Sequence, residues 1–224
     1  MDNVELVKQK ISTAAQKAGK TFDDITVVCA TKTRDIETVK KIKDWGFHIA
    51  GENRVQELTE KYQPIEGISW QIVGQLQTNK VKYIADKVDM IQSLDRESLA
   101  AEIDRQCKKI GKVMPVLVEV NISEIEGRGG VMYDEAVDFA NLVAEKYKNV
   151  KVEGFMTVLP ICDNDEERSV FCKKMKTLFD KAKKLCQTCD IKFLSMGMSD
   201  DYEVAVENGA NMIRLGRCLF GERH

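Results

Sequence analysis

Residues 25–30 read ITVVCA, and the chain continues with TKT, whose middle residue is Lys32. The run is short, apolar and rich in β-branched side chains, which is typical of a strand buried on both faces of a parallel sheet. A helical pattern follows over residues 35–45 and ends at Gly46. The stretch therefore predicts a buried strand, a loop and a helix, with Lys32 in the loop that leaves the strand.

The same strand–helix alternation continues along the rest of the chain. Further strand-like runs occupy residues 47–50, 70–73, 90–93, 113–120, 152–158, 191–195 and 212–215. Helical patterns lie between them and are clearest over residues 136–147 and 171–185. With the first run, these form about eight strand–helix units. An amphipathic helix, apolar at helical spacing from Val4 to Ala18, precedes the first strand.

About eight such units fit either a closed barrel or a long doubly wound sheet. Even spacing, without a linker or a break in composition, favours the barrel. A chain of 224 residues is short for a barrel, so its loops must be tight. We predict an α/β protein with a single (β/α)8 barrel domain over residues 1–224 and an extra N-terminal helix.

Composition excludes several classes of protein. The 34 Lys and Arg residues nearly balance the 36 Asp and Glu residues, which gives no hint of a nucleic acid or an anionic membrane as partner. Residues 1–19 carry charges throughout, unlike a signal peptide, and no apolar run approaches the ~18 residues that span a membrane. The seven scattered cysteines are typical of reduced thiols. We therefore expect a cytoplasmic protein, and we expect it to be a monomer.

Polar residues at strand ends are the candidates for chemistry, because the βα loops of a barrel carry its site. A lysine at a barrel mouth is partly desolvated, which lowers its pKa and favours the nucleophilic amine of Lys32. From position alone, a solvated loop lysine is the plainer interpretation. Asn53 follows the second strand and is either a helix N-cap or a group beside a ligand. GQLQTNK at 74–80 is explained locally as a loop and a helix cap.

Two segments near the C-terminus together suggest a phosphate site. In LSMGMSDD at 194–201 a strand runs into Gly197, and Ser199 or Asp200 is expected to cap a helix. Backbone N–H groups and a serine hydroxyl at a helix start bind anions. In IRLGR at 213–217, Gly216 lets the backbone approach a ligand closely. Loops after strands seven and eight are the usual phosphate site of a barrel, although each segment alone is also explained as a tight turn.

Metal and hydrolase chemistry are disfavoured. Cys186 and Cys189 form a lone CxxC, and the only histidines are His48 and His224. A zinc site needs more ligands than this, and a Ser–His–Asp arrangement needs a well-placed histidine. We therefore expect no metal.

Taken together, these stretches resemble the pyridoxal-phosphate homeostasis proteins, the stand-alone relatives of the alanine racemase N-terminal barrel. The resemblance covers essentially the whole chain. The stretches that carry it are ATKT at 30–33, GEN at 51–53 with VQE at 55–57, LQTNK at 76–80, VNIS at 120–123, residues 194–201, and IRLG at 213–216 with FG at 220–221.

The resemblance implies a fold-type III barrel whose cofactor is pyridoxal 5′-phosphate, held as a Schiff base on Lys32. Arg214 would face the pyridine nitrogen, and Ser199 would bind the phosphate with backbone groups nearby. The residues implied in cofactor binding are Lys32, Asn53, Met156, Met198, Ser199, Arg214, Gly216 and Arg217. The chain departs from the family at Gln71, where histidine is common, at Arg34-Asp35, where Lys-Pro is common, and at Glu119, where glutamine is frequent.

The resemblance further implies a protein of vitamin B6 homeostasis that buffers or delivers the cofactor, without robust catalysis. An arginine can only donate, so the pyridine nitrogen is left unprotonated and the ring is a weaker electron sink. We expect no second domain beyond His224 to supply the tyrosine base of the racemases. The tyrosines at 62, 83, 133, 147 and 202 fall in predicted helices or at their starts.

A pyridoxal-phosphate-dependent amino-acid racemase and an unrelated phosphate-binding barrel, such as an isomerase, are the alternatives. Whether apo-enzymes receive the cofactor stays open.

Overall fold

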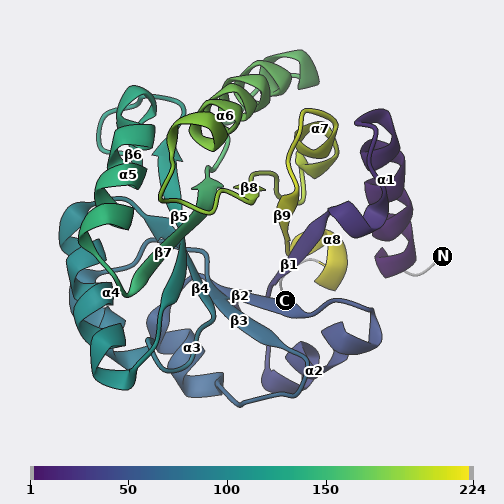
Figure 1. The fold of residues 1–224 in the computed structure, drawn as a ribbon. Coiled ribbons are helices and arrows are strands. Elements are labelled where there is room, and N and C mark those ends of the chain that lie inside the picture. The colour runs from purple at the N-terminus through teal and green to yellow at the C-terminus, as the bar shows by residue number, and fades with distance from the viewer. Residues whose placement is uncertain (1–2, 222–224) are drawn as a thin grey trace.

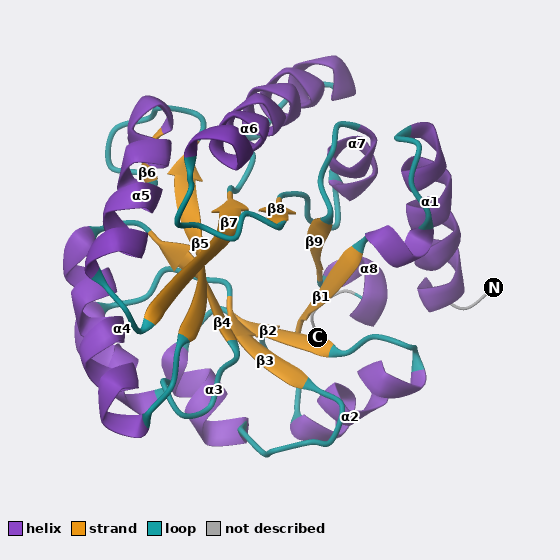
Figure 2. Cartoon of the chain, in the orientation of Figure 1, coloured by secondary structure: helices purple, strands orange, loops and turns teal. Residues whose placement is uncertain are grey.

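A closed ring of parallel strands forms the centre of the protein, whose computed structural model describes residues 3–221 (Figures 1 and 2). Neighbouring strands pair in parallel, β9 lies beside β1, and β4 also pairs with β5, which closes the ring. The ring strands are β1 (Thr26–Ala30), β2 (Ile49–Glu52), β3 (Ser69–Ile72), β4 (Met90–Leu94), β5 (Met114–Asn121), β7 (Val150–Met156), β8 (Phe193–Ser195) and β9 (Met212–Leu215). The barrel predicted from the sequence is confirmed.

Helices surround the ring (Figure 2). The helix α1 precedes β1, as predicted, and packs against α7 and α8. The α-helices are α1 (Asn3–Lys17), α2 (Ile36–Asp44), α3 (Val55–Lys61), α4 (Glu97–Ile110), α5 (Ala136–Lys146), α6 (Asp165–Leu185), α7 (Tyr202–Glu207) and α8 (Arg217–Phe220). No helix within residues 3–221 has both the length and the apolar character that crossing a membrane requires.

Three short 3₁₀ helices and one short strand complete the fold. The 3₁₀ helices are η1 (Phe22–Asp24), η2 (Thr78–Tyr83) and η3 (Tyr133–Glu135), and η2 stands after β3 where the other units have an α-helix. The strand β6 (Val131–Met132), which the sequence did not predict, pairs with β5 beside the ring. It is only two residues long, so it leaves no alternating pattern.

Side-chain capping explains where two of the helices begin. The Asp35 carboxylate accepts from the Thr38 N–H at the start of α2, and the Asn164 side chain accepts from the Glu167 N–H at the start of α6. Each satisfies one of the N–H groups that have no partner within the helix.

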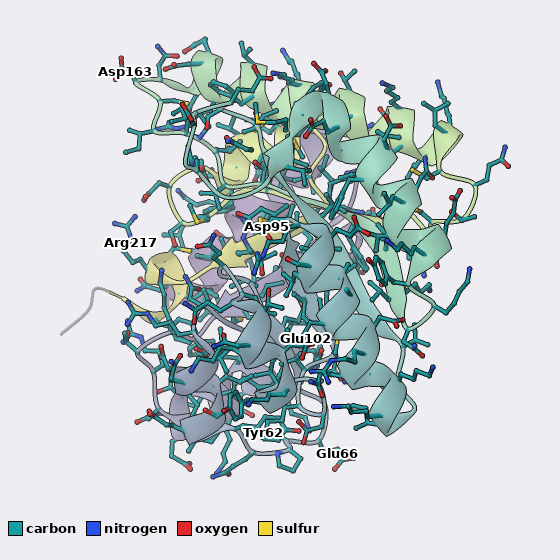
Figure 3. All side chains as sticks on the ribbon, turned by 90° about the vertical axis from the view of Figure 1, so that its left-hand side faces the viewer. Tyr62, Glu66, Asp95, Glu102, Asp163 and Arg217 are labelled. Atoms are coloured by element: carbon teal, nitrogen blue, oxygen red, sulfur yellow. The ribbon has the colours of Figure 1, made fainter. Side chains whose placement is uncertain are left out.

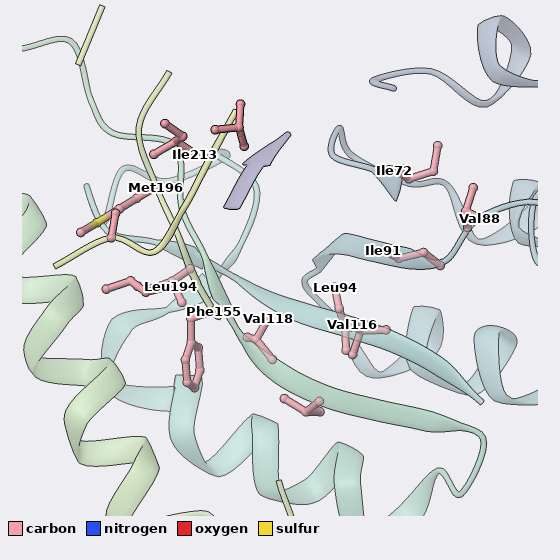
Figure 4. Packing of buried hydrophobic residues seen from close by; sticks show 14 of the residues in the cluster. Ile72, Val88, Ile91, Leu94, Val116, Val118, Phe155, Leu194, Met196 and Ile213 are labelled. Atoms are coloured by element: carbon pink, nitrogen blue, oxygen red, sulfur yellow. The ribbon is translucent and has the colours of Figure 1, made fainter. Parts of the chain in front are cut away.

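Two apolar layers hold the barrel. Along β5, Leu117 points into the ring and Val118 points outward, as alternation in a strand requires. Figure 4 shows Val118 and Phe155 pointing toward the helices, in the larger of the two layers. The inner layer is small and consists of Val28, Met90, Leu117, Met156 and Met212. Buried polar side chains share the interior with this layer, so the barrel is not a purely apolar core.

Candidate functional site

A cleft of about 190 Å³ lies where β1, β8 and β9 end. It contains six of the eight residues that the sequence named for cofactor binding. Its lining is Ala30, Lys32, Met198, Ser199, Asp200, Arg214, Gly216 and Arg217. In Figure 3, Arg217, which follows β9, and Asp163, which follows β7, project from the same edge of the molecule. The cleft therefore lies at the carboxyl ends of the strands, the face that carries the site in other barrels.

Lys32 is presented by a tight turn. The Thr31 N–H still donates to the Gly51 carbonyl of β2 at 3.0 Å, and the Arg34 N–H then donates to the Thr31 carbonyl at 3.0 Å. Between them Thr33 adopts a φ of 63°, in the left-handed region that non-glycine residues rarely enter. Lys32 is half-buried at the end of β1. The structure thus places it at the strand exit and on the cleft, as the sequence predicted.

Ser199 lies in the loop after β8, beside the start of α8. Its Oγ accepts from the backbone N–H groups of Gly216 at 3.4 Å and Cys218 at 3.3 Å. These two bonds hold the loop after β8 against the start of α8, so that Ser199 and Gly216 line the cleft together.

The expectation that Ser199 or Asp200 caps the helix that follows them was wrong. The N-cap residue of α7 is Asp201, and Ser199 instead bonds the start of α8. Gly197, with a φ of 101°, turns the chain, and the Met198 N–H donates to the Asp201 carboxylate at 2.5 Å. This local turn directs Ser199 across to the next unit.

Arg214 is buried on the inner side of the cleft. Its Nη1 donates to the Ser195 Oγ and its Nη2 to the Thr157 carbonyl, both at 2.7 Å. Burial lowers the pKa of the guanidinium to about 10, against the raising effects of Asp201 and Glu119. At neutral pH it remains a cation that can only donate.

A row of hydrogen bonds continues from Arg214 across the barrel interior. The Ser195 hydroxyl donates to the Gln92 Oε1, and the Gln92 Nε2 donates to the Gln71 Oε1, each at 2.7 Å. Gln71, at the position where the family often has histidine, therefore ends this row and is not among the residues that line the cleft. The sequence could not show the row, because its members, Arg214, Ser195, Gln92 and Gln71, come from four separate strands.

Glu119 is a titratable group that the sequence named only as a departure from the family. Burial raises the pKa of its carboxyl to about 7, Asp95 adds to the rise, and Arg214 and Arg128 oppose it. Within residues 3–221 its Oε2 is buried without a hydrogen-bond partner. A carboxyl that changes charge near neutral pH thus lies in the field of Arg214.

Asn53 and Met156 are not in the Lys32 cleft. Asn53 lines a neighbouring polar pocket of about 510 Å³ with Gln75 and Lys80, where β2 and β3 end. The N-cap position of α3 is Arg54, so Asn53 does not cap that helix. Met156 is 1% exposed and packs in the inner apolar layer. Their roles in binding stay predictions.

Within residues 3–221, no metal-binding cluster, histidine or tyrosine lines the Lys32 cleft. Residues 3–221 contain no group of three or more His, Cys, Asp or Glu side chains that could hold a metal ion. The His48 Nδ1 lies 3.1 Å from the Gly67 carbonyl, before β2 and β3 begin, and His224 lies outside the described residues. The five tyrosines are not among the residues that line the cleft in the described chain.

Comparison with known proteins places this geometry in context. The family described as "Alanine racemase, N-terminal domain" matches residues 5–224. A protein named "Pyridoxal phosphate homeostasis protein" from Aquifex aeolicus is 38% identical over 224 residues, which cover 99% of this chain and 97% of that protein.

Two solved structures share the fold. An unknown protein from Bifidobacterium adolescentis has a TM-score of 0.89 at 29% identity, with 97% of this chain and 93% of that chain covered. PipY of Synechococcus elongatus, with PLP bound, has a TM-score of 0.79 at 23% identity, with 93% of this chain and 100% of that chain covered. At 23% identity, the likeness to PipY shows the fold alone.

Proposed function

Because this chain belongs to the alanine racemase N-terminal domain family, and within it to the pyridoxal phosphate homeostasis proteins, we propose that it binds pyridoxal 5′-phosphate and buffers or delivers it. The observation that carries the proposal is the cleft, which brings Lys32 together with Ser199 and Gly216. A lysine amine forms a Schiff base with an aldehyde, and N–H groups at a helix start bind phosphate. We propose that Lys32 holds the cofactor by such a bond.

The residues present fit this cofactor. Lys32 supplies a half-buried amine, and Ser199 with the backbone of Gly216, which line the same cleft, would supply hydrogen-bond donors for a dianionic phosphate in exchange for their mutual bond. Arg214 supplies a fixed donor that cannot give up its proton at neutral pH. The bound cofactor would supply an electron sink, and an arginine beside its ring nitrogen makes that sink weak.

The composition of the cleft supports a carrier over a catalyst. Racemisation needs a proton removed on one face of the substrate and returned on the other. Besides Lys32, the titratable residues that line the cleft are Asp200, Arg214 and Arg217, and Asp200 is paired with Arg217. Glu119, whose pKa lies near neutral, interacts with Arg214 but is not among the lining residues.

An amino-acid racemase remains the second candidate, because the matching family is named for that enzyme. The loaded protein, incubated in deuterated water with single L- and D-amino acids, should show neither inversion nor α-deuterium incorporation at ordinary enzyme rates of roughly 1 per second. Chiral chromatography measures the inversion, and mass spectrometry measures the deuterium incorporation. Turnover at that rate, lost in Lys32→Ala, would promote the racemase.

Ser199→Ala is expected to weaken pyridoxal 5′-phosphate binding by about 1–2 kcal/mol, roughly 5–30-fold, because one charge-assisted hydrogen bond among several is removed. Pyridoxal, which lacks the phosphate, should bind wild-type protein much more weakly and respond little to the substitution. Calorimetric titration measures both. Ser169→Ala, at a hydroxyl that donates to Asn208, is the matched control and should keep wild-type affinity. Equal affinity for the two vitamers would rule out the phosphate site.

We also propose a cytoplasmic, monomeric protein with one barrel domain, whose recipients would be apo-enzymes that need the cofactor. The seven cysteines are free thiols in the described structure, which suits a reducing compartment. The formal charge of −2 offers no field to attract nucleic acid. Light scattering checks the monomer, since a mass other than the 25.4 kDa of one chain would contradict it.

A further inference from the structure

The turn that carries Lys32 is held from α3 by a residue outside the cleft. The Lys61 ammonium donates to the carbonyl oxygens of Thr31 at 2.7 Å and Arg34 at 3.0 Å, which are the two ends of the turn. The Lys61 side chain is only 10% exposed, although lysine is among the residues least often buried. The Lys61 ammonium thus links Thr31 and Arg34, the residues on both sides of Lys32.

Two carboxylates accompany this cation. The Lys61 Nζ lies 2.7 Å from the Oε1 of Glu52, at the end of β2, and 3.2 Å from the Oε1 of Glu57, on α3. Each carboxylate also bonds the turn directly. Glu52 accepts from the Thr31 hydroxyl, and Glu57 accepts from the Thr33 N–H. Thr33 is the residue with the left-handed backbone, a conformation that persists only where its surroundings enforce it.

The cluster of Lys61, Glu52 and Glu57 is poorly suited to a purely stabilising role. The Glu52 side chain is fully buried, and within residues 3–221 its Oε2 has no hydrogen-bond partner. Burial raises the pKa of Glu52, while Lys61 and Thr31 oppose the rise. Desolvation of buried ion pairs offsets much of their attraction, so such a pair is weak support for stability. Its direct bonds to the Lys32 turn point to a different role.

We propose that Lys61, held by Glu52 and Glu57, is a positioning residue that fixes the 31–34 turn and thereby aims the Lys32 amine at the cofactor aldehyde. The inference rests on the proposed function and adds residues that the site itself does not contain. It predicts that the cluster of Lys61, Glu52 and Glu57 governs covalent capture of the cofactor, and not the binding of its phosphate, because Ser199 and Gly216, the residues proposed to bind the phosphate, belong to the loops after β8 and β9.

The first test measures how Lys61→Met reacts with one ligand and binds another. Pyridoxal 5′-phosphate can form an imine with Lys32, whereas pyridoxamine 5′-phosphate carries an amine and cannot. We expect imine formation, followed by stopped-flow absorbance, to slow by about tenfold or more, because small misplacement of a reacting group lowers rates steeply. Pyridoxamine 5′-phosphate affinity should stay within about twofold of wild type, well under the tenfold that 1.4 kcal/mol represents.

Lys112→Met is the matched control. The Lys112 ammonium also donates to two backbone carbonyls, those of Ala85 at 3.1 Å and Val88 at 2.5 Å, but it lies before β5 begins, at the other end of the barrel. It should leave imine formation and the affinity for both ligands unchanged, whatever it does to stability.

Glu57→Gln supplies a second variant with a milder change, since the Glu57 side chain is 25% exposed and the fold does not depend on burying it. It should slow imine formation and speed hydrogen exchange of the Thr33 amide in the cofactor-free protein. This variant decides the matter if Lys61→Met does not fold. Imine formation at the wild-type rate, or parallel losses for both ligands, would overturn the inference. If the wild-type protein forms no imine at all, the proposed function fails instead.

Discussion

Lys32→Ala is expected to abolish covalent attachment of pyridoxal 5′-phosphate. Lys32 is the one lysine among the described residues that line the cleft, and only a primary amine there can form the imine that borohydride reduces to a stable secondary amine. Wild-type protein should be yellow when loaded, lose that absorbance on reduction, and carry the label on the peptide that contains Lys32. Absorbance spectra and peptide mass spectrometry make the measurement.

A lysine near the mouth but outside the cleft provides the control. Lys80 lines the neighbouring pocket with Asn53, and Lys80→Ala should retain full labelling. Lys32→Ala should still bind pyridoxamine 5′-phosphate, because Ser199 and the start of α8 are intact. A label on another lysine in wild-type protein would show that the covalent site is elsewhere, and an absence of any label would favour the unrelated phosphate-binding barrel.

Glu119→Gln is expected to stabilise the cofactor-free protein at pH 8 but not at pH 4. Burial raises the pKa of Glu119 from 4.5 to about 7 in the folded state. Between those values the unfolded chain loses the proton while the folded protein keeps it, so folded-state stability falls as pH rises through this window. The full difference of about 3 kcal/mol is reached above pH 7. Glutamine does not titrate and removes this penalty.

Urea unfolding of both proteins across this pH range measures the effect. The advantage of Glu119→Gln should grow from pH 4 to pH 8 and then level off. Between pH 5 and pH 8, the upper part of this range, Glu97→Gln is the control, because Lys146 and Tyr147 lower the pKa of the exposed Glu97 carboxyl and the folded protein therefore keeps it ionised there. A gain for Glu119→Gln that does not vary with pH would show that the carboxyl is not held protonated in the folded protein.

The strands and helices of the barrel could be predicted because each strand–helix unit has its own local sequence pattern. Runs such as 25–30 are apolar on both faces, and helices such as α2 repeat every 3.6 residues, so short-range periodicity specifies both. The position of Lys32 followed directly, since it stands beside the end of such a run. Boundaries moved by a few residues: β2 begins at Ile49 instead of Phe47, because the Phe47 N–H is still bonded to Ile42 of α2.

Only part of the arrangement of Ser199 and Gly216, the residues proposed to bind the phosphate, could be predicted from the sequence. Gly216 and Ser199 were named from the ordinal positions of their loops, a rule that barrels share. The chain alone could not show that Ser199 crosses to bond the start of α8, because that contact joins residues 17 and 19 positions apart. Met156 is a different case. The resemblance implies that it binds the cofactor, but in the closed barrel its side chain lies in the inner apolar layer.

The sequence by itself thus determined the barrel, the lysine at the exit of β1 and the two loops that line the cleft with it, because periodicity and chain order are local properties. Only the tertiary structure decided which side chains meet across the ring. Strand register, barrel closure and burial by distant residues together produce three features. These are the row of hydrogen bonds from Arg214 to Gln71, the raised pKa of Glu119, and the hydrogen bonds from Lys61 to the Lys32 turn. Hydrogen bonds and desolvation act over a few ångströms in space, and separation along the chain does not limit them.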